Sequence, residues 1–177
     1  MHKAPLVPHP DSNPGRVTRI EAGISVSPKM LRLSYWLEGE LATLRIPADA
    51  GLQRGDKLWE HTCFEAFVRQ KGQSAYYEFN FSPSRAWQAM RFRAYRDGGA
   101  IAETPVTQVM VSREAAVLRL DALVMLDRLP EPPGRPLQLG LSAVVENREG
   151  GISFWALKHA SGRADFHHDD TFVLEHA

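Results

Sequence analysis

Two glutamates, Glu65 and Glu78, are the residues of this sequence whose types and spacing most directly suggest chemistry. Each belongs to a strand-like segment, and a two-residue turn at Lys71 and Gly72 would place the two side chains directly opposite each other. Like charges that face each other across a strand pair are destabilising. The pair therefore predicts a compensating cation, a shared proton or a ligand. Opposed carboxyl groups at roughly 5 Å are also the arrangement that retaining glycoside hydrolases use.

Side chains alternate between the two faces of a strand, so the neighbours of both glutamates can be assigned to faces. Aromatic rings beside carboxylates, amides and guanidinium groups are what a sugar-like ligand needs. The alternative is a solvated sheet face with weak cross-strand ion pairs. The predicted polar face holds Cys63, Glu65, Phe67, Tyr76, Glu78, Asn80, Arg91, Arg93 and Tyr95, and the predicted core face holds Phe64, Ala66, Val68, Tyr77, Phe79, Phe81, Met90, Phe92 and Ala94.

The predicted position of Arg91 and Arg93 argues against hydrolysis. Glycoside hydrolysis needs one protonated carboxyl group as general acid. Guanidinium groups beside Glu65 and Glu78 would favour the ionised form of both, because an opposite charge lowers a carboxyl pKa. We therefore expect a binding site rather than a catalytic one.

A second polar cluster lies near the C-terminus. Imidazole and carboxylate groups suit several divalent metals. The spacing is not diagnostic, since adjacent histidines on an extended chain point apart. We expect no metal site, and a hydrogen-bonded loop that closes the fold is the preferred interpretation. The weak metal-ligand candidates are His159, Asp165, His167, His168 and Asp169.

The elements that must position these residues are mostly short strands separated by turn signals. Many short strands with few helical runs predict an all-β fold, an antiparallel β-sandwich of jelly-roll or immunoglobulin-like appearance with few or short helices. Residues 115–129 fit either a helix or a strand, and we favour a strand followed by a short turn. The predicted strands are residues 17–27, 30–37, 41–46, 62–70, 75–81, 87–95, 107–112, 116–120, 137–145 and 152–158.

The length of 177 residues suits a single domain over residues 16–177. Residues 1–15 carry four prolines and predict a flexible arm. The formal net charge of zero gives no electrostatic reason to expect nucleic acid or an anionic membrane as a partner. The single cysteine and the absence of an apolar leader at the N-terminus favour a cytoplasmic protein. The sequence does not indicate the oligomeric state.

Four segments, LWEHTCFEAFV, YYEFNFSPSRAW, RFRAYR and WALKHASGRADFHHDDTF, resemble bacterial DOMON-like proteins related to the family nine carbohydrate-binding modules. The likeness spans most of residues 58–172 and implies a β-sandwich that binds a carbohydrate-like small molecule without acting on it. It implies a saccharide held between tryptophans. The candidates are Trp59, Trp87 and Trp155, with Glu65, Glu78, Asn80 and Arg91 as polar partners.

Some relatives of this kind bind haem, with an axial methionine and a histidine or lysine. Met90 or Met110 with His159 or His168 would be the corresponding residues here, although Met90 falls on the predicted core face. A haem-binding protein therefore remains one alternative to sugar binding. A glycoside hydrolase that uses Glu65 and Glu78 remains another.

Overall fold

The computed structural model describes residues 2–177, with only the backbone of His2, and the fold is an all-β sandwich with four single-turn 3₁₀ helices in this part of the chain. The strands are β1 (His2–Pro8), β2 (Val17–Val26), β3 (Met30–Gly39), β4 (Gln53–Arg54), β5 (Cys63–Gln70), β6 (Tyr76–Phe81), β7 (Ala86–Ala94), β8 (Asp97–Ala100), β9 (Val106–Glu114), β10 (Val117–Met125), β11 (Leu137–Glu146), β12 (Ile152–Ala156) and β13 (Leu174–His176). The helices are η1 (Leu41–Thr43), η2 (Leu58–Glu60), η3 (Leu126–Arg128) and η4 (Asp169–Thr171).

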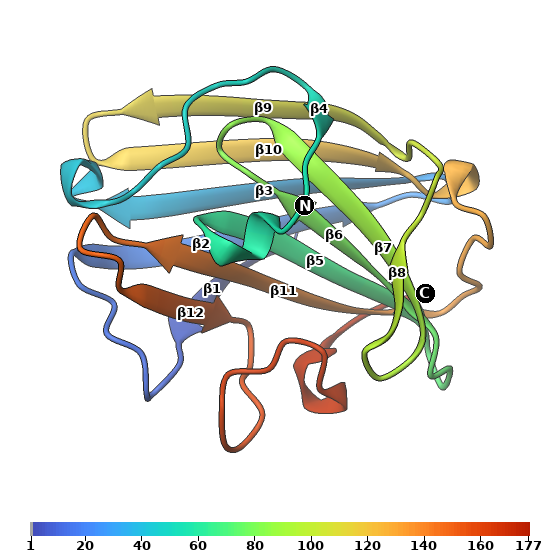
Figure 1. Cartoon of the computed structure of the whole chain (residues 1–177). Coiled ribbons are helices and arrows are strands. Elements are labelled where there is room, and N and C mark those ends of the chain that lie inside the picture. Colours follow the sequence, from blue (N-terminus) through green and yellow to red (C-terminus); the bar gives the residue numbers. More distant parts are fainter. Residues whose placement is uncertain (1) are drawn as a thin grey trace.

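Two layers form the sandwich, with the main hydrophobic core between them (Figure 1). We call the layer β1-β2-β3-β10-β9 the first sheet, and the layer β4-β7-β6-β5-β11-β12 the second sheet. Neighbouring strands are antiparallel except for β4 and β7. The prediction of an antiparallel β-sandwich is confirmed. The largest fully buried side chains between the layers include Ile20, Leu33, Tyr35, Phe64, Phe79, Phe81 and Leu120.

Residues 2–8 form a strand, β1, where a flexible arm was expected over residues 1–15; Met1 lies outside the described residues. His2 to Leu6 pair with β2 in the first sheet, while Val7 and Pro8 pair with β12 in the second. Leu6 packs into the main core. The prolines are tolerated because β1 is short and passes from one sheet to the other. Few of its backbone N–H groups are therefore required for hydrogen bonds between strands.

The predicted strands agree with the structure except near residues 41–46. That segment forms η1 and a single bridge between Leu44 and Asn147. Residues 115–129 form a strand, β10, and then the short helix η3, as predicted. No strand was predicted at β1, β4, β8 or β13.

The second sheet is buried on both faces in its central strands. Its outer face carries a second apolar cluster, covered by the segment 157–173, which runs past β12 toward the C-terminus (Figure 1). Gly140 on β11 permits this packing, because a Cβ there would lie 2.9 Å from the carbonyl oxygen of Thr171. The cluster consists of Phe67, Tyr76, Met90, Phe92, Val144, Ala156, Phe166 and Phe172.

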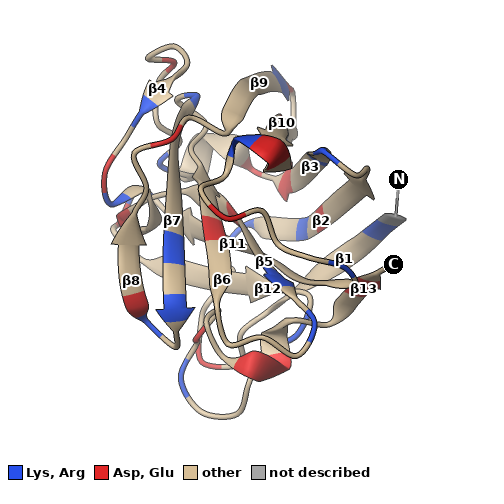
Figure 2. Ribbon diagram, turned by 90° about the vertical axis from the view of Figure 1, so that its right-hand side faces the viewer, with Lys and Arg blue, Asp and Glu red and all other residues tan. Residues whose placement is uncertain are grey.

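Charged residues of opposite sign lie close together on the surface strands. Figure 2 shows basic and acidic segments side by side on β7 and β8, where Arg93 and Asp97 form an ion pair at 3.0 Å. None of the described helices is long and apolar enough to cross a membrane.

Candidate functional site

The register of β5 and β6 places Glu65 and Glu78 on the same face but not directly opposite each other. Glu65 pairs with Asn80, and Phe67 pairs with Glu78. The predicted register is wrong by two residues, because the connection from β5 to β6 spans residues 71–75 rather than two residues. A shift of two residues keeps every side chain on its face, since the period of a strand is two. The glutamates are therefore diagonal neighbours on the outer face of the second sheet.

In the third strand, β7, the side chains lie on the faces opposite to those predicted. Met90 pairs with Glu78, so Met90 and Phe92 join the outer face, whereas Arg91 pairs with Tyr77 and points to the other side. Our prediction matched the apolar residues of β7 to the main core. That criterion fails here because the outer face is also apolar.

Neither predicted arginine reaches the glutamates. Arg91 contacts Glu131, and Arg93 contacts Asp97. The arginine at the site is Arg96, which the sequence analysis did not select. Arg96 and Tyr95 form the turn between β7 and β8, and Arg96 has a φ of 55°. This left-handed conformation is uncommon for a residue with a side chain.

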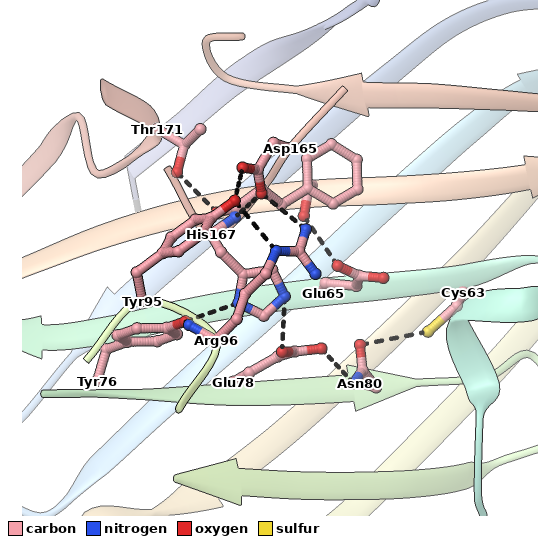
Figure 3. Close-up of polar contacts among 12 residues, drawn as sticks. Cys63, Glu65, Tyr76, Glu78, Asn80, Tyr95, Arg96, Asp165, His167 and Thr171 are labelled. Atoms are coloured by element: carbon pink, nitrogen blue, oxygen red, sulfur yellow. Dashed lines mark hydrogen bonds and ion pairs between the residues drawn. The ribbon is translucent and has the colours of Figure 1, made fainter. Parts of the chain in front are cut away.

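Arg96 and Tyr95 reach across to Asp165 in the covering segment (Figure 3). The Arg96 guanidinium donates to Asp165 at 2.8 Å and to the Tyr95 hydroxyl at 3.2 Å. The Tyr95 hydroxyl donates to the other oxygen of Asp165 at 2.6 Å. These bonds tie the β7–β8 turn to the segment 157–173, and they hold the guanidinium at the edge of the outer face.

A cavity of about 360 Å³ opens between this face, the turn and the covering segment. Trp59, on η2, stands at the cavity and remains 38% exposed. The walls of the cavity combine aromatic rings with the two buried glutamates. The lining residues are Trp59, Glu65, Glu78, Met90, Phe92, Arg96, Gly98, Gly99, Val144, Phe154, Ala164, Phe166 and His167.

The other two predicted tryptophans lie in the main core and not at the cavity. Trp87 is buried there, with the Arg54 guanidinium 4.7 Å from its ring centre. Trp155 is also buried, and its indole N–H donates to the Ser153 hydroxyl at 3.0 Å. Of the three candidates, Trp59 alone lines the cavity.

Hydrogen bonds hold His167 in place at the back of the cavity. The backbone N–H of Arg96 donates to the Tyr76 hydroxyl at 3.1 Å, so that hydroxyl is free to donate its own proton to His167 Nδ1 at 2.7 Å. A neutral imidazole that accepts at Nδ1 carries its proton on Nε2. That Nε2 faces Glu78 Oε2 at 3.5 Å, while Asn80 donates to Glu78 Oε1 at 2.7 Å (Figure 3).

Burial shifts the pKa of all three titratable groups in this network. It raises the pKa of Glu78 to about 7, against the weaker opposing effects of Asn80 and Arg96. Burial, and then the charge of Glu78, raise the pKa of Glu65 well above its usual value. Burial, and then Arg96, lower the pKa of His167 to about 4. The imidazole is therefore neutral at pH 7, and at least one of the two glutamates is protonated over part of the neutral range.

This arrangement overturns our argument against a general acid. Arg91 and Arg93 were expected beside the glutamates, whereas the structure places both of them elsewhere. The cavity holds a carboxyl group with a pKa near neutrality.

Two of the five metal-ligand candidates, Asp165 and His167, belong to this site. His159 donates to the Val7 carbonyl, His168 accepts from the Asp170 N–H at the start of η4, and Asp169 pairs with Arg69. Over residues 2–177, no three His, Cys, Asp or Glu side chains are grouped as metal ligands.

The proposed haem ligands are not brought together at the cavity. Met90 lines it, but Met110 is exposed on β9 in the first sheet. His159 and His168 are outside its lining.

Comparison with solved structures supports the fold. No protein-family model matches the chain, and no curated protein sequence matches it. A crystal structure of a "putative carbohydrate-binding protein" from Bacteroides uniformis superposes with a TM-score of 0.71 at 16% identity, and the match covers 97% of this chain and 84% of that chain.

Two further similar structures are of one family nine carbohydrate-binding module from Caldicellulosiruptor kristjanssonii. Its complex with glucose has a TM-score of 0.48 at 10% identity, covering 85% of this chain and 75% of that chain. Its complex with cellotriose has the same TM-score and identity, covering 81% and 67%.

Proposed function

We propose that the cavity on the outer face of the second sheet binds a carbohydrate-like small molecule without acting on it. The observation that carries this proposal is the state of Glu78. The residue lines the cavity, its side chain is almost fully buried, and Oε2 accepts no hydrogen bond from the described residues, with His167 Nε2 3.5 Å away. A buried acceptor left unpaired is costly, so a ligand that donates a hydrogen bond there would gain affinity.

The walls of the cavity support the same class of ligand. Trp59 and Phe92 supply aromatic surfaces on which the C–H face of a sugar ring can pack. Glu65 and Glu78 supply acceptors for its hydroxyl groups. The volume lies within the range of about 300–1,000 Å³ that is usual for small-molecule sites. The shared fold with a protein described as carbohydrate-binding is in keeping with this proposal.

Glycan-array screening followed by calorimetric titration tests the proposal. We expect Trp59→Ala and Glu78→Gln each to weaken binding by about tenfold or more, the effect of losing a ring contact or a charge-assisted hydrogen bond. Trp36→Ala and Glu131→Gln are the matched controls. Trp36 packs near Lys3 and Arg119 on the first sheet, and Glu131 contacts Arg91 outside the cavity. Equal losses in the controls, or no binding by the native protein, would rule the proposal out.

Glycoside hydrolysis is the second candidate, and the pKa of Glu78 near neutrality favours it. A carboxyl group that holds a proton at pH 7 can act as general acid, and the other carboxyl group, once ionised, can act as nucleophile or base. Turnover of aryl glycosides that Glu65→Gln abolishes would establish this activity. The absence of turnover over a broad substrate panel would exclude it.

A further inference from the structure

Once its carboxyl groups are ionised, the cavity has more negative than positive groups that are free of ion pairs. Arg96 is the one cationic side chain in its lining, and its guanidinium is already engaged by Asp165 and Tyr95. Glu65 and Glu78 have no ion pair with a lysine or an arginine within the described residues. The site therefore lacks positive charge on the side where the two carboxyl groups lie.

Once ionised, these carboxyl groups can only accept hydrogen bonds. Glu78 Oε2 accepts no hydrogen bond from the described residues and only faces His167 Nε2 at 3.5 Å, and Glu65 receives only a long bond of 3.4 Å from the Ser142 hydroxyl. A hydroxyl group donates one hydrogen bond, whereas an ammonium group donates three and also carries the missing charge. The carboxyl oxygens of the cavity therefore match an ammonium group better than a hydroxyl group.

The apolar walls fit the same group. Trp59, Phe92, Phe154 and Phe166 all line the cavity around the glutamates. Aromatic faces attract cations, and the attraction is larger where water is excluded. Rings together with buried carboxylates thus form a site for a desolvated cation.

From this geometry we infer that the ligand is an amino sugar, with its protonated amine bound between Glu65 and Glu78 and its ring against Trp59. This inference rests on the proposed sugar-binding function and narrows it to one class. A negatively charged sugar acid is disfavoured by the same two carboxyl groups.

Binding of the amine should release protons from the glutamates. The charged and titratable groups around Glu78 are Glu65 and Cys63 on β5, Tyr76 on β6, Arg96 on the β7–β8 turn, and Asp165 and His167 on the covering segment. His167 is neutral above about pH 4. A bound ammonium group stabilises both carboxylates, so protons held by Glu65 and Glu78 leave on binding.

Calorimetry with glucosamine, N-acetylglucosamine and glucose near pH 6.5 tests the inference, repeated in buffers of different ionisation enthalpy. We expect glucosamine to bind about tenfold or more tightly than the other two, as a desolvated charge-assisted contact allows, with net proton release. Glu78→Gln should remove that preference while circular dichroism remains native. Glu131→Gln, the matched exposed control, should keep it.

The outcomes separate this inference from the proposed function. Equal or tighter binding of glucose or N-acetylglucosamine overturns the amine inference and leaves sugar binding intact. Binding of cyclohexylamine but of none of the three sugars supports the amine site and overturns sugar binding. No binding of any of the four probes overturns both.

Discussion

At the scale of single residues, Glu78 and His167 make the stability of the protein depend on pH in opposite directions. The folded pKa of Glu78 is about 7, above its ordinary 4.5, so the native state binds more protons between these values. Stability therefore falls as pH rises through that window. The folded pKa of His167 is about 4, below its ordinary 6.5, so stability rises with pH between those values. The two effects partly cancel between about pH 4.5 and pH 6.5.

Substitution of Glu78 by Gln should separate the two effects. Gln mimics the protonated carboxyl and still accepts from Asn80. The variant should gain stability relative to the native protein as pH rises from about 4.5 to above 7, by a total on the order of 3 kcal/mol. Urea denaturation at a series of pH values measures this difference. A difference that stays flat over the range would mean that burial does not raise the Glu78 pKa.

Replacement of His167 by Gln should have the opposite pH dependence. It removes a group whose protonation is disfavoured by burial and by Arg96. Relative to the native protein, this variant should gain stability as pH falls from about 6.5 toward 4. The same denaturation series checks the result, and a relative loss in acid would contradict it.

At the scale of elements, the hairpin of β7 and β8 positions the charged side of the site. Two residues, Tyr95 and Arg96, connect the strands, and Gly98 and Gly99 in β8 form part of the cavity wall. Gly98 lies so close to β7 that a Cβ there would be 2.0 Å from the Arg91 carbonyl oxygen and 2.6 Å from Phe92 Cα. A Cβ at Gly99 would meet nothing within 4 Å.

The two glycines therefore form a matched pair. Gly98→Ala should push β8 away from β7 and destabilise the protein by roughly 1–3 kcal/mol, the usual cost of overpacking against backbone. It should also weaken ligand binding, because the turn that carries Arg96 moves with β8. Gly99→Ala should leave stability within about 0.5 kcal/mol of the native protein. Thermal unfolding and titration of both variants check this, and similar behaviour of the two would contradict it.

The sequence predicted the elements better than it predicted the site. Alternation assigned Glu65, Tyr76 and Glu78 to one face correctly, because the charged residues of β5 and β6 all lie on that face. The same criterion failed for β7, where Met90 and Phe92 pack in the second cluster and Ala89 packs in the main core. When both faces of a strand are apolar, the alternation of residues cannot tell the face in the main core from the outer face.

Other misses have a common physical origin in tertiary pairing. Arg96 enters the site from a turn, where strand alternation does not apply. The strands β4 and β8 have two and four residues, too few for a periodic pattern, and each exists because β7 offers it an edge. The positions of Trp87 and Trp155 depend on which face of the second sheet each occupies, which residue type alone does not reveal.

At the scale of the whole molecule, β1 connects the two sheets at one side of the sandwich. It covers the edge of β2 in one sheet and of β12 in the other. Without it, both strands would present unpaired backbone groups, which favours aggregation. The N-terminal strand is therefore part of the folding unit.

Neighbouring substitutions in β1 test this role. Leu6 is buried in the main core, whereas the Val7 side chain is 46% exposed. Leu6→Ala should lower the free energy of unfolding by about 2–5 kcal/mol, as for other core leucines. Val7→Ala should change it by about 0.5 kcal/mol or less. Chemical denaturation compares the two, and an equally small effect of both would mean that this strand contributes little to the fold.

The separation of the second apolar cluster from the main core has a consequence for how such a protein can diversify. Ring positions such as Phe154 and Phe166 surround the cavity without filling the space between the sheets. Exposed positions of the segment 157–173 can therefore accumulate substitutions while the main core stays in place, whereas Leu157, Phe166 and Phe172 must keep their apolar packing. A library confined to this segment and to Trp59 would sample new specificities on an unchanged scaffold.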